Sequence, residues 1–596
     1  MTDNGRHIGT VGVIGVGTMG AGLAEVLARS GLNVIAVEVD QPSLARAHAF
    51  LEESTRNAVT KGKLTEPARD ALLSRITGTL DLSRVAAADL VIEAVPENID
   101  LKRALFAELD GIVRPEAILA TSSSALSVTD LAMSTAAPHR VMGMHFFNPV
   151  PVQELVEVVG TVVTPPALIS DITTLACRLG KHPIVVGDTA GFIANALLMG
   201  YLNHAVTMYE NKYATREDID AAMQLGCGYP LGPLALADLV GLDTCRAVLE
   251  EMYAQGGDRR HAPAPLWAQM ISAGRLGRKS GHGFYRYDRP GFGVVVPEDI
   301  APSPSLDTTG HTRPIHRVAV IGSGIMAVGI AEIFARAGHA TTLVARTPDT
   351  ADRALSRLTA SLDRALAKGK ITPAHHADTL SHCTTTIDLT ELHQVDLVVE
   401  AVAEDLHVKT DIFRRLDAIC RPGAILATTT SSLPVVTLAA ATSRPGDVIG
   451  MHFFNPATVM RLVEVVSAVT TAPEVQDTVT DLARRLGKHP VHCADRAGFI
   501  VNALLFPYLN DAVKMLAAHY ASIDDIDQAM TSGCHLPMGP FALMDVVGLD
   551  VSLAIQRELH REYRDPGLRP APLLEHMVKG GYLGRKTGHG FRSTPC

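Results

Sequence analysis

The chain has 596 residues, of which 47% are apolar and 19% charged, and it carries a formal net charge of −10. This composition is typical of a globular protein with several domains, and the negative charge argues against nucleic acid as a partner. No apolar run reaches the ~20 residues that a membrane-spanning helix needs, so we expect no membrane partner.

The cysteines and the N-terminal residues indicate the compartment. The eight cysteines show no CxxC spacing, which favours reduced thiols over a disulfide or zinc framework. Residues 1–6 are polar and lead directly into an expected strand, so we expect no signal peptide. We therefore expect a cytoplasmic protein without a metal site.

The first third of the chain predicts alternating strands and helices. Short apolar runs typical of buried strands occur at residues 11–14, 33–39, 90–94 and 117–120, and a helical pattern occupies 21–29. From about Gly191 the pattern changes to long amphipathic segments such as 192–211. The chain therefore begins with an α/β Rossmann-type domain, followed by an all-α helical domain.

This pair of domains is repeated in tandem. Residues 143–149 and 178–183 recur unchanged 307 positions later, as 450–456 and 485–490. A repeat of this length is a folding unit rather than a solenoid module. The stretch between the copies is rich in Pro, Gly, Ser and Thr, as linkers are. The expected parts are a Rossmann domain (7–188) and a helical domain (189–288), a linker (289–315), and a second Rossmann domain (316–495) and helical domain (496–593).

A glycine-rich turn follows the first strand. Gly15, Gly17 and Gly20 have the GxGxxG spacing and open a helix, and Glu38 ends the next strand. In this context the glycines let the backbone approach a pyrophosphate, and the helix N-terminus supplies free amides. A carboxylate at position 38 accepts hydrogen bonds from ribose hydroxyls. The first copy is therefore expected to bind NAD.

The second copy differs at the position that reads the ribose. Its turn has Gly322, Gly324 and Ala327, and Ala345 followed by Arg346 stands where the first copy has the acid. Without the carboxylate a 2′-phosphate is not repelled, and an arginine offers it a charge-assisted fork. The second copy is thus expected to bind NADP or NAD, with NADP favoured. The alternative is that Arg346 is a solvated surface residue.

Four polar positions recur as a candidate catalytic set. His145 lies 21 residues after Ser124 and 12 before Glu157, and Asn195 opens the helical domain. The second copy has His452, Ser431, Glu464 and Asn502 at the same spacings. A lone histidine between apolar residues is often a core residue, but a glutamate inside an apolar run needs a partner. We therefore expect each set to meet at the cleft between the two domains of its copy.

These motifs resemble the 3-hydroxyacyl-CoA dehydrogenase family over nearly the whole chain outside the linker. The resemblance rests on Met-His-Phe-Phe-Asn-Pro, Leu-Val-Glu-Val-Val, Asp-Thr-Ala-Gly-Phe-Ile-Ala-Asn and Gly-Arg-Lys-Ser-Gly-His-Gly-Phe-Tyr. It implies that the two histidines are acid–base residues, oriented by the glutamates, and that the serines and asparagines hold the reacting oxygens.

The resemblance also implies binding positions. Those near the nicotinamide cofactor are Glu97, Lys102, Asn148 and Lys279, with Glu404, Lys409, Asn455 and Lys586 in the second copy. Those near coenzyme A are Ser54 and Lys61, with Ser361 and Lys368. One departure lies close to the histidine in sequence: the first copy has Gln153-Glu154 where the second has Met460-Arg461. This change either tunes the first copy to a more polar acyl group or belongs to the surface.

The implied activity is reversible hydride transfer between an (S)-3-hydroxyacyl-CoA, such as 3-hydroxybutyryl-CoA, and a nicotinamide cofactor. Two alternatives remain open. The substrate is a carrier-protein thioester or a free hydroxy acid, or one copy is catalytic and the other a structural partner. Because the family dimerises through its helical domain, we expect an intrachain pseudo-dimer of the two copies or a homodimer.

Overall fold

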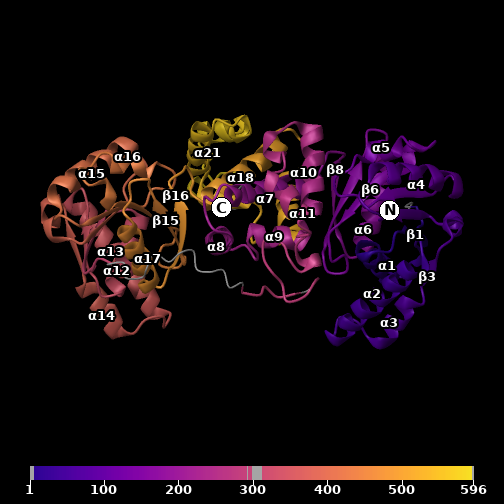
Figure 1. Cartoon of the computed structure of the whole chain (residues 1–596), viewed down its shortest axis with the longest axis horizontal. Helices are drawn as coiled ribbons and strands as arrows, with labels where there is room; N and C mark the ends of the chain where they lie inside the picture. Colours follow the sequence, from indigo (N-terminus) through magenta and orange to yellow (C-terminus); the bar gives the residue numbers. More distant parts are fainter. Residues whose placement is uncertain (1–5, 292, 298–311, 593–596) are drawn as a thin grey trace.

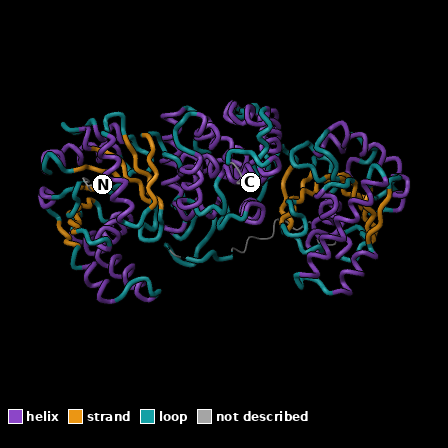
Figure 2. The backbone as a smooth tube through the Cα atoms, turned by 180° about the vertical axis from the view of Figure 1, so that it is seen from behind, coloured by secondary structure: helices purple, strands orange, loops and turns teal. Residues whose placement is uncertain are grey.

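The computed structural model describes residues 6–291, 293–297 and 312–592. Each copy has a sheet domain and a helical domain, so the expected fold class is confirmed. The two sheet domains lie at opposite ends of the molecule, and the two helical domains lie side by side between them (Figures 1 and 2). Most of the expected linker lies outside the described residues.

The sheet of the first copy has eight strands in the order β3-β2-β1-β4-β5-β6-β7-β8. All neighbours are parallel except β6 and β7, an antiparallel pair that adds to the expected βαβ pattern. The strands are β1 (Thr10–Ile14), β2 (Asn33–Val37), β3 (Ile76–Thr79), β4 (Leu90–Glu93), β5 (Ile118–Thr121), β6 (Val141–Phe146), β7 (Leu155–Gly160) and β8 (His182–Gly187). The order reverses around β1, where ligands bind in open α/β sheets.

Helices cover both faces of this sheet because its strands are apolar on both sides. Val13 packs beneath α1 and α6, whereas Ile14, the next residue, packs beneath α4 and α5. The helices of the first sheet domain are α1 (Thr18–Arg29), α2 (Gln41–Thr60), α3 (Glu66–Leu73), α4 (Ile99–Ile112), α5 (Val128–Ala132) and α6 (Pro166–Arg178). Those of its helical domain are α7 (Ala194–Glu210), α8 (Arg216–Cys227), α9 (Pro233–Val240), α10 (Leu242–Gly256) and α11 (Pro265–Ser272).

The second copy repeats this arrangement, with strand order β11-β10-β9-β12-β13-β14-β15-β16. Its strands are β9 (Arg317–Ile321), β10 (Ala340–Val344), β11 (Cys383–Thr386), β12 (Leu397–Glu400), β13 (Ile425–Thr428), β14 (Val448–Phe453), β15 (Leu462–Ser467) and β16 (His489–Ala494). Its helices are α12 (Ile325–Arg336), α13 (Pro348–Ala367), α14 (Pro373–Ser381), α15 (Leu406–Ile419), α16 (Val435–Ala439), α17 (Pro473–Arg485), α18 (Val501–Ala517), α19 (Ile523–Gln528), α20 (Pro540–Val547), α21 (Leu549–Tyr563) and α22 (Pro572–Lys579).

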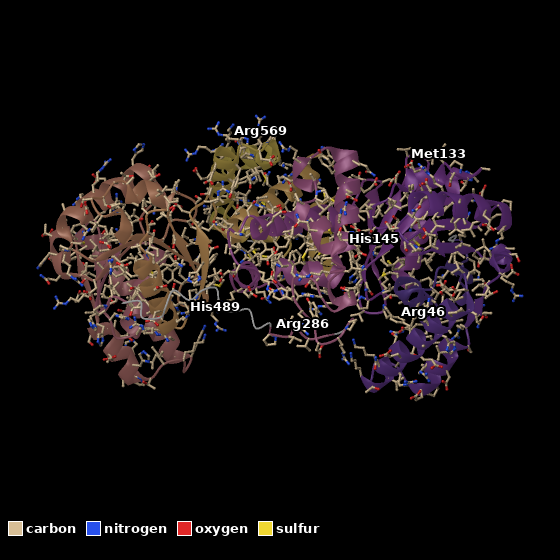
Figure 3. The ribbon with its side chains drawn as sticks, in the orientation of Figure 1. Arg46, Met133, His145, Arg286, His489 and Arg569 are labelled. Atoms are coloured by element: carbon tan, nitrogen blue, oxygen red, sulfur yellow. The ribbon has the colours of Figure 1, made fainter. Side chains whose placement is uncertain are left out.

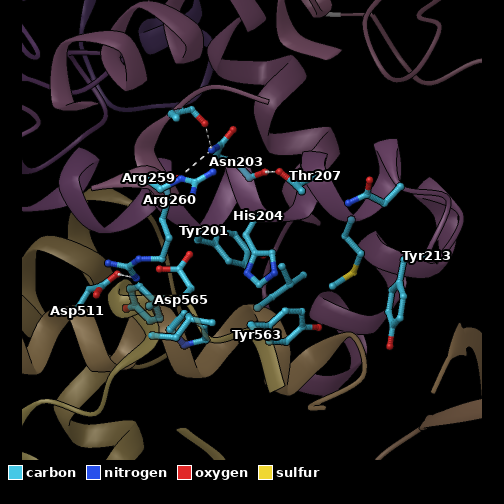
Figure 4. Close-up of a pocket in the computed structure, with 18 of the residues that line it drawn as sticks. Tyr201, Asn203, His204, Thr207, Tyr213, Arg259, Arg260, Asp511, Tyr563 and Asp565 are labelled. Carbon is cyan, nitrogen blue, oxygen red and sulfur yellow. Dashed lines mark hydrogen bonds and ion pairs between the residues drawn. The ribbon is translucent and has the colours of Figure 1, made fainter. Parts of the chain in front are cut away.

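The two helical domains share one apolar core, in which α7 packs against α18. At its edge Arg260 of the first copy forms an ion pair of 2.6 Å with Asp511 of the second (Figure 4). Each helical domain also reaches the other copy's sheet. The Tyr213 hydroxyl donates to the Ala494 carbonyl at 2.7 Å, and the Tyr520 hydroxyl donates to the Gly187 carbonyl at 2.8 Å. The copies are therefore joined by packing and by reciprocal hydrogen bonds.

Two further features bear on the sequence analysis. The cysteines in the described part of the chain carry free thiols, seven in all. Among the described helices, none combines the length and the apolar character that crossing a bilayer requires.

Candidate active site

Cross-strand pairing places a histidine beside a glutamate. His145 on β6 is the register partner of Glu157 on β7, and the His145 Nδ1 lies 2.6 Å from the Glu157 Oε2. The glutamate is fully buried and the histidine is 5% exposed. Because a carboxylate accepts, Nδ1 carries the proton toward it, and Nε2 is the ring nitrogen that a substrate can use. His145 lies at the junction of the sheet and helical domains (Figure 3).

The same glutamate also accepts hydrogen bonds from the start of the helical domain. Its Oε1 accepts from the backbone amides of Ile193 and Ala194, both at 3.0 Å, where α7 begins without a capping side chain of its own. The chain reaches this point through two left-handed residues, Gly191 (φ 79°) and Phe192 (φ 49°). A phenylalanine in this region is strained, and its ring lies 5.6 Å from the His145 ring. One carboxylate thus orients the imidazole and fixes the start of α7.

The second copy has the same geometry. The His452 Nδ1 lies 2.6 Å from the Glu464 Oε2, and the Glu464 Oε1 accepts from Ile500 at 3.0 Å and Val501 at 2.9 Å. Phe499 repeats the left-handed φ, at 50°. Nothing in this arrangement distinguishes the two sites chemically.

Ser124 lies at the carboxyl end of the sheet and is bound to Glu97. The Ser124 amide donates to the Glu97 Oε1 at 2.9 Å, and Lys102 lies 3.1 Å from the other oxygen. Burial alone would raise the pKa of Glu97, but Lys102 and the hydrogen bonds from Ser123 and Ser124 hold that pKa below its usual value. An ionised carboxylate therefore fixes the serine loop.

Lys102 itself is buried rather than open to a ligand. It is 1% exposed, and its Nζ donates to the Glu93 oxygens at 2.9 and 3.1 Å. The position matches the expected neighbourhood of the cofactor, and the ammonium group is paired with Glu93 and Glu97. Lys409 repeats this with Glu400 and Glu404. These lysines hold the glutamates in place.

The corresponding loop of the second copy also meets the helical domain. The Ser431 amide donates to the Glu404 Oε1 at 2.8 Å, and the Asn502 Nδ2 donates to the Ser431 carbonyl at 3.2 Å. Asn502 is the second residue of α18, and Asn195 occupies the same place in α7. The structure therefore brings the expected serine and asparagine together across the domain boundary of this copy.

The first glycine-rich turn fits a dinucleotide. A Cβ at Gly20 would lie 1.9 Å from the Gly15 carbonyl oxygen, whereas a Cβ at Gly17 would meet open space. α1 begins there with no capping side chain and no acid in its first turn, so its amides are available to an anion. The Glu38 carboxylate accepts from the Val16 amide at 2.6 Å and from the Val39 amide at 3.1 Å, and β2 ends at Val37 rather than at the expected Val39. The turn, the helix end and the acid thus supply the groups that NAD binding requires.

The second turn follows a different path and carries positive charge. Gly322 has a φ of 133°, against 82° at Gly15, and the turn accommodates the buried side chain of Ala327. Arg346 is exposed just beyond β10, and the Arg357 Nη1 on α13 donates to the Ser323 carbonyl at 3.3 Å. The first copy has Val39 and Phe50 at these two positions. The second copy thus has two arginines close to Ala345, the position at which the first copy has the Glu38 carboxylate.

The remaining expected residues are either exposed, paired with an aspartate, or serines on a helix. Asn148 is exposed on the loop after β6, and Lys279 is paired with Asp243 at 2.5 Å. The Ser54 hydroxyl donates to the buried Glu25 at 2.6 Å. In the second copy Lys586 pairs with Asp550, and Ser361 lies on α13 as Ser54 lies on α2. Lys61 and Lys368 are exposed at the ends of α2 and α13.

Several residues in these sites have only a weak signal in the sequence. Lys181 donates to the Val150 and Gln153 carbonyls at 2.5 and 2.6 Å and so holds the loop that carries Asn148. Burial lowers the pKa of Lys181 to about 8. Lys181 lies inside the motif 178–183 that recurs at 485–490, so the repeat is a signal for it in the sequence. Arg357 had no such signal, because only the packing of α13 brings it to the glycine-rich turn.

A separate cavity of about 360 Å³ lies between the helical domains, next to Tyr201, His204 and Arg260 (Figure 4). Burial lowers the pKa of His204 to about 4. Neither His145 nor His452 is among the residues that line this cavity. It is therefore not the catalytic cleft.

Comparison with known proteins assigns both domains of each copy. The model of the 3-hydroxyacyl-CoA dehydrogenase NAD binding domain matches residues 10–189 and 317–496. The model of the C-terminal domain of that family matches residues 191–287 and 498–594.

Similar proteins carry the same family name. A 3-hydroxybutyryl-CoA dehydrogenase of Clostridioides difficile is 45% identical over 275 residues, which cover 46% of this chain and 98% of that protein. The human mitochondrial hydroxyacyl-coenzyme A dehydrogenase is 40% identical over 285 residues, 46% of this chain and 90% of that protein. The crystal structure of an Escherichia coli 3-hydroxybutyryl-CoA dehydrogenase aligns with a TM-score of 0.68 and 27% identity, covering 97% of this chain and all of that one. The chain therefore belongs to the 3-hydroxyacyl-CoA dehydrogenase family, as two complete tandem copies of an NAD-dependent oxidoreductase.

Proposed function

We propose that both copies catalyse reversible oxidation of an (S)-3-hydroxyacyl-CoA, such as 3-hydroxybutyryl-CoA, to the 3-ketoacyl-CoA. The observation that carries this proposal is the buried histidine–glutamate pair beside a serine loop and a dinucleotide-binding turn, present twice with the same distances. The similar proteins are named for this activity and support the substrate class.

The geometry supports a defined role for each group. His145 Nε2 removes the proton of the substrate hydroxyl, while Nδ1 stays bound to Glu157, which stabilises the imidazolium that forms. Ser124 and Asn195 donate hydrogen bonds to the substrate oxygen as its charge changes. NAD, which Gly15, Gly17 and Glu38 would hold at the glycine-rich turn, would supply the hydride acceptor for the carbon that bears the hydroxyl. His452, Glu464, Ser431 and Asn502 act in the same way at the second site.

The initial-rate panel that tests this proposal uses acetoacetyl-CoA, longer 3-ketoacyl-CoAs, a carrier-protein 3-ketoacyl thioester and free acetoacetate. We expect reduction of the CoA thioesters at the highest kcat/KM. A higher kcat/KM for the carrier-protein thioester or the free acid would favour the alternative of a biosynthetic dehydrogenase. The two exposed lysines, Lys61 and Lys368, favour a substrate that carries phosphates.

The two copies differ in the cofactor that they favour. In the first, the Glu38 carboxylate lies at the ribose position and repels a 2′-phosphate. In the second, Ala345 removes that charge and Arg346 and Arg357 flank the position. One charge-assisted pair contributes ~1.5–3 kcal/mol, which is ~10–100-fold in affinity. We therefore propose NAD for the first copy and NADP for the second.

Replacing Arg346 and Arg357 with alanine is expected to weaken NADPH binding at the second site by ~10–100-fold, with little change for NADH. Equilibrium titration of cofactor fluorescence measures both affinities. The matched control is Arg353→Ala, because Arg353 is exposed on the same helix and paired with Asp349. Equal losses for NADH and NADPH would contradict a role in reading the 2′-phosphate.

We also propose that the helical domains form an intrachain pseudo-dimer, so that no second chain is needed. The reciprocal Tyr213 and Tyr520 hydrogen bonds and the shared core support it. Light scattering of the purified chain is expected to give the single-chain mass of 63.4 kDa. A mass twice as large would favour the homodimer. Separately, we propose that the protein is cytoplasmic.

A double-mutant cycle tests the ion pair at this interface. Arg260→Ala and Asp511→Ala remove the two partners of the 2.6 Å contact. Because both side chains are largely buried, we expect a coupling free energy of ~1–3 kcal/mol in the unfolding of the intact chain. A coupling near zero would show that the contact does not hold the copies together.

A further inference from the structure

The two active sites share their acid–base groups but differ in what reads the cofactor. The histidine–glutamate distances agree to the printed precision, at 2.6 Å in both copies. The positions that match coenzyme A are serine and lysine in both. At the ribose position the first copy has a carboxylate that accepts two backbone amides, and the second has alanine with two nearby arginines.

Two sites that prefer the same cofactor would only double the rate of one dehydrogenase reaction. Two sites that accept the same acyl thioester and different dinucleotides connect two pools of reducing equivalents, because the product of one site is the substrate of the other.

We propose that the chain transfers reducing equivalents between NADPH and NAD⁺, with the acyl thioester as a reusable carrier. The inference rests on the function proposed above, including the different cofactor preference of each copy. It adds an activity in which the thioester is not consumed.

The two half-reactions balance. At the first site the 3-hydroxyacyl thioester loses a hydride to NAD⁺ and its hydroxyl proton to His145, which gives the 3-ketoacyl thioester, NADH and a proton. At the second site the 3-ketoacyl thioester takes a hydride from NADPH and a proton from His452. The sum is NADPH plus NAD⁺ giving NADP⁺ plus NADH, and both the thioester and the proton cancel.

Because the carrier cancels, its own equilibrium does not enter the net reaction. The direction depends only on the NADPH/NADP⁺ and NADH/NAD⁺ ratios, and the exchange runs either way. The sheet domains lie at opposite ends of the molecule (Figure 1), and we expect the thioester to pass between the sites through solvent. Free diffusion predicts that the two sites can also act on separate chains.

The test mixes the intact protein with NADPH and the thionicotinamide analogue of NAD⁺, whose reduced form absorbs apart from NADPH. Acetoacetyl-CoA is added at one hundredth of the dinucleotide concentration. We expect the analogue to be reduced by many equivalents per thioester, and no reduction without the thioester. Reduction of at most one equivalent per thioester would overturn the proposal.

Single-site variants decide whether both sites take part. His145→Gln and His452→Gln are each expected to abolish exchange, and an equal mixture of the two variants is expected to restore it. Exchange at the wild-type rate by either variant alone would mean that one site uses both dinucleotides, which overturns the proposal. The retained single-cofactor reduction of acetoacetyl-CoA in each variant shows that the other site is folded.

A binding measurement separates failure of this inference from failure of the proposed function. Fluorescence titration of the intact chain is expected to show one NADPH site that Arg346→Ala and Arg357→Ala together weaken at least tenfold. Acetoacetyl-CoA reduction with NADH but no NADPH binding would leave the dehydrogenase function standing and overturn the exchange. No acetoacetyl-CoA reduction with either cofactor would overturn both.

Discussion

Replacing His145 with glutamine is expected to lower turnover at the first site by ~10²–10⁴-fold, the usual contribution of a general acid–base group. In the proposed mechanism Nε2 of this ring accepts the proton, and a glutamine amide cannot take a proton from the substrate. NADH-dependent reduction of acetoacetyl-CoA should therefore fall, while NADPH-dependent reduction stays. His452→Gln should give the opposite pattern.

The matched control is His48→Gln, since His48 is exposed on α2 and pairs with the exposed Glu52. It is expected to leave both rates unchanged. Loss of all turnover from either catalytic variant alone would mean that the copies do not act as independent sites. That outcome would favour the alternative in which one copy is a structural partner of the other.

Replacing Glu157 with glutamine should lower kcat at the first site by ~10²–10⁴-fold and also destabilise the chain. The carboxylate accepts from the His145 ring and from the Ile193 and Ala194 amides. Glutamine offers one oxygen and one NH₂ group, so it cannot accept on both sides. Each charge-assisted hydrogen bond contributes ~1.5–3 kcal/mol, which thermal unfolding can detect.

The split between kcat and KM separates orientation from simple loss of folding. In the folded fraction we expect kcat to fall with little change in the KM for NADH, because Glu157 does not touch the cofactor turn. Glu154→Gln is the control, since Glu154 is exposed on the neighbouring loop and paired with His182 at 3.5 Å. A normal kcat per folded molecule in Glu157→Gln would reduce Glu157 to a structural residue.

Much of the fold could be predicted because its signals are local or repeated. The apolar run of β1, the glycine-rich turn and the acid at position 38 lie within one βαβ unit, so their spacing alone predicts the dinucleotide site. The repeat at a constant offset identifies two complete units. A glutamate inside the apolar run of β7 indicates a buried partner, and β6 supplies His145 as its register neighbour.

Other features required three-dimensional packing. The β6–β7 pair is antiparallel within a parallel sheet, and no local pattern marks that reversal. The second role of Glu157, as the acceptor at the start of α7, depends on where the helical domain docks. The family resemblance places Lys102 near the cofactor, but its burial and its ion pairs with Glu93 and Glu97 could not be predicted from the sequence.

The sequence by itself determined the duplication, the Rossmann-type and helical domains, the two candidate catalytic sets and the replacement of Glu38 by Ala345 in the second copy. These features depend on residue type and on spacing along the chain, both of which can be read from the sequence itself. Only the tertiary structure decided that Arg357 reaches the second glycine-rich turn and that the helical domains share one core. Both depend on long-range packing, in which residues far apart in sequence are brought together by the burial of apolar surface.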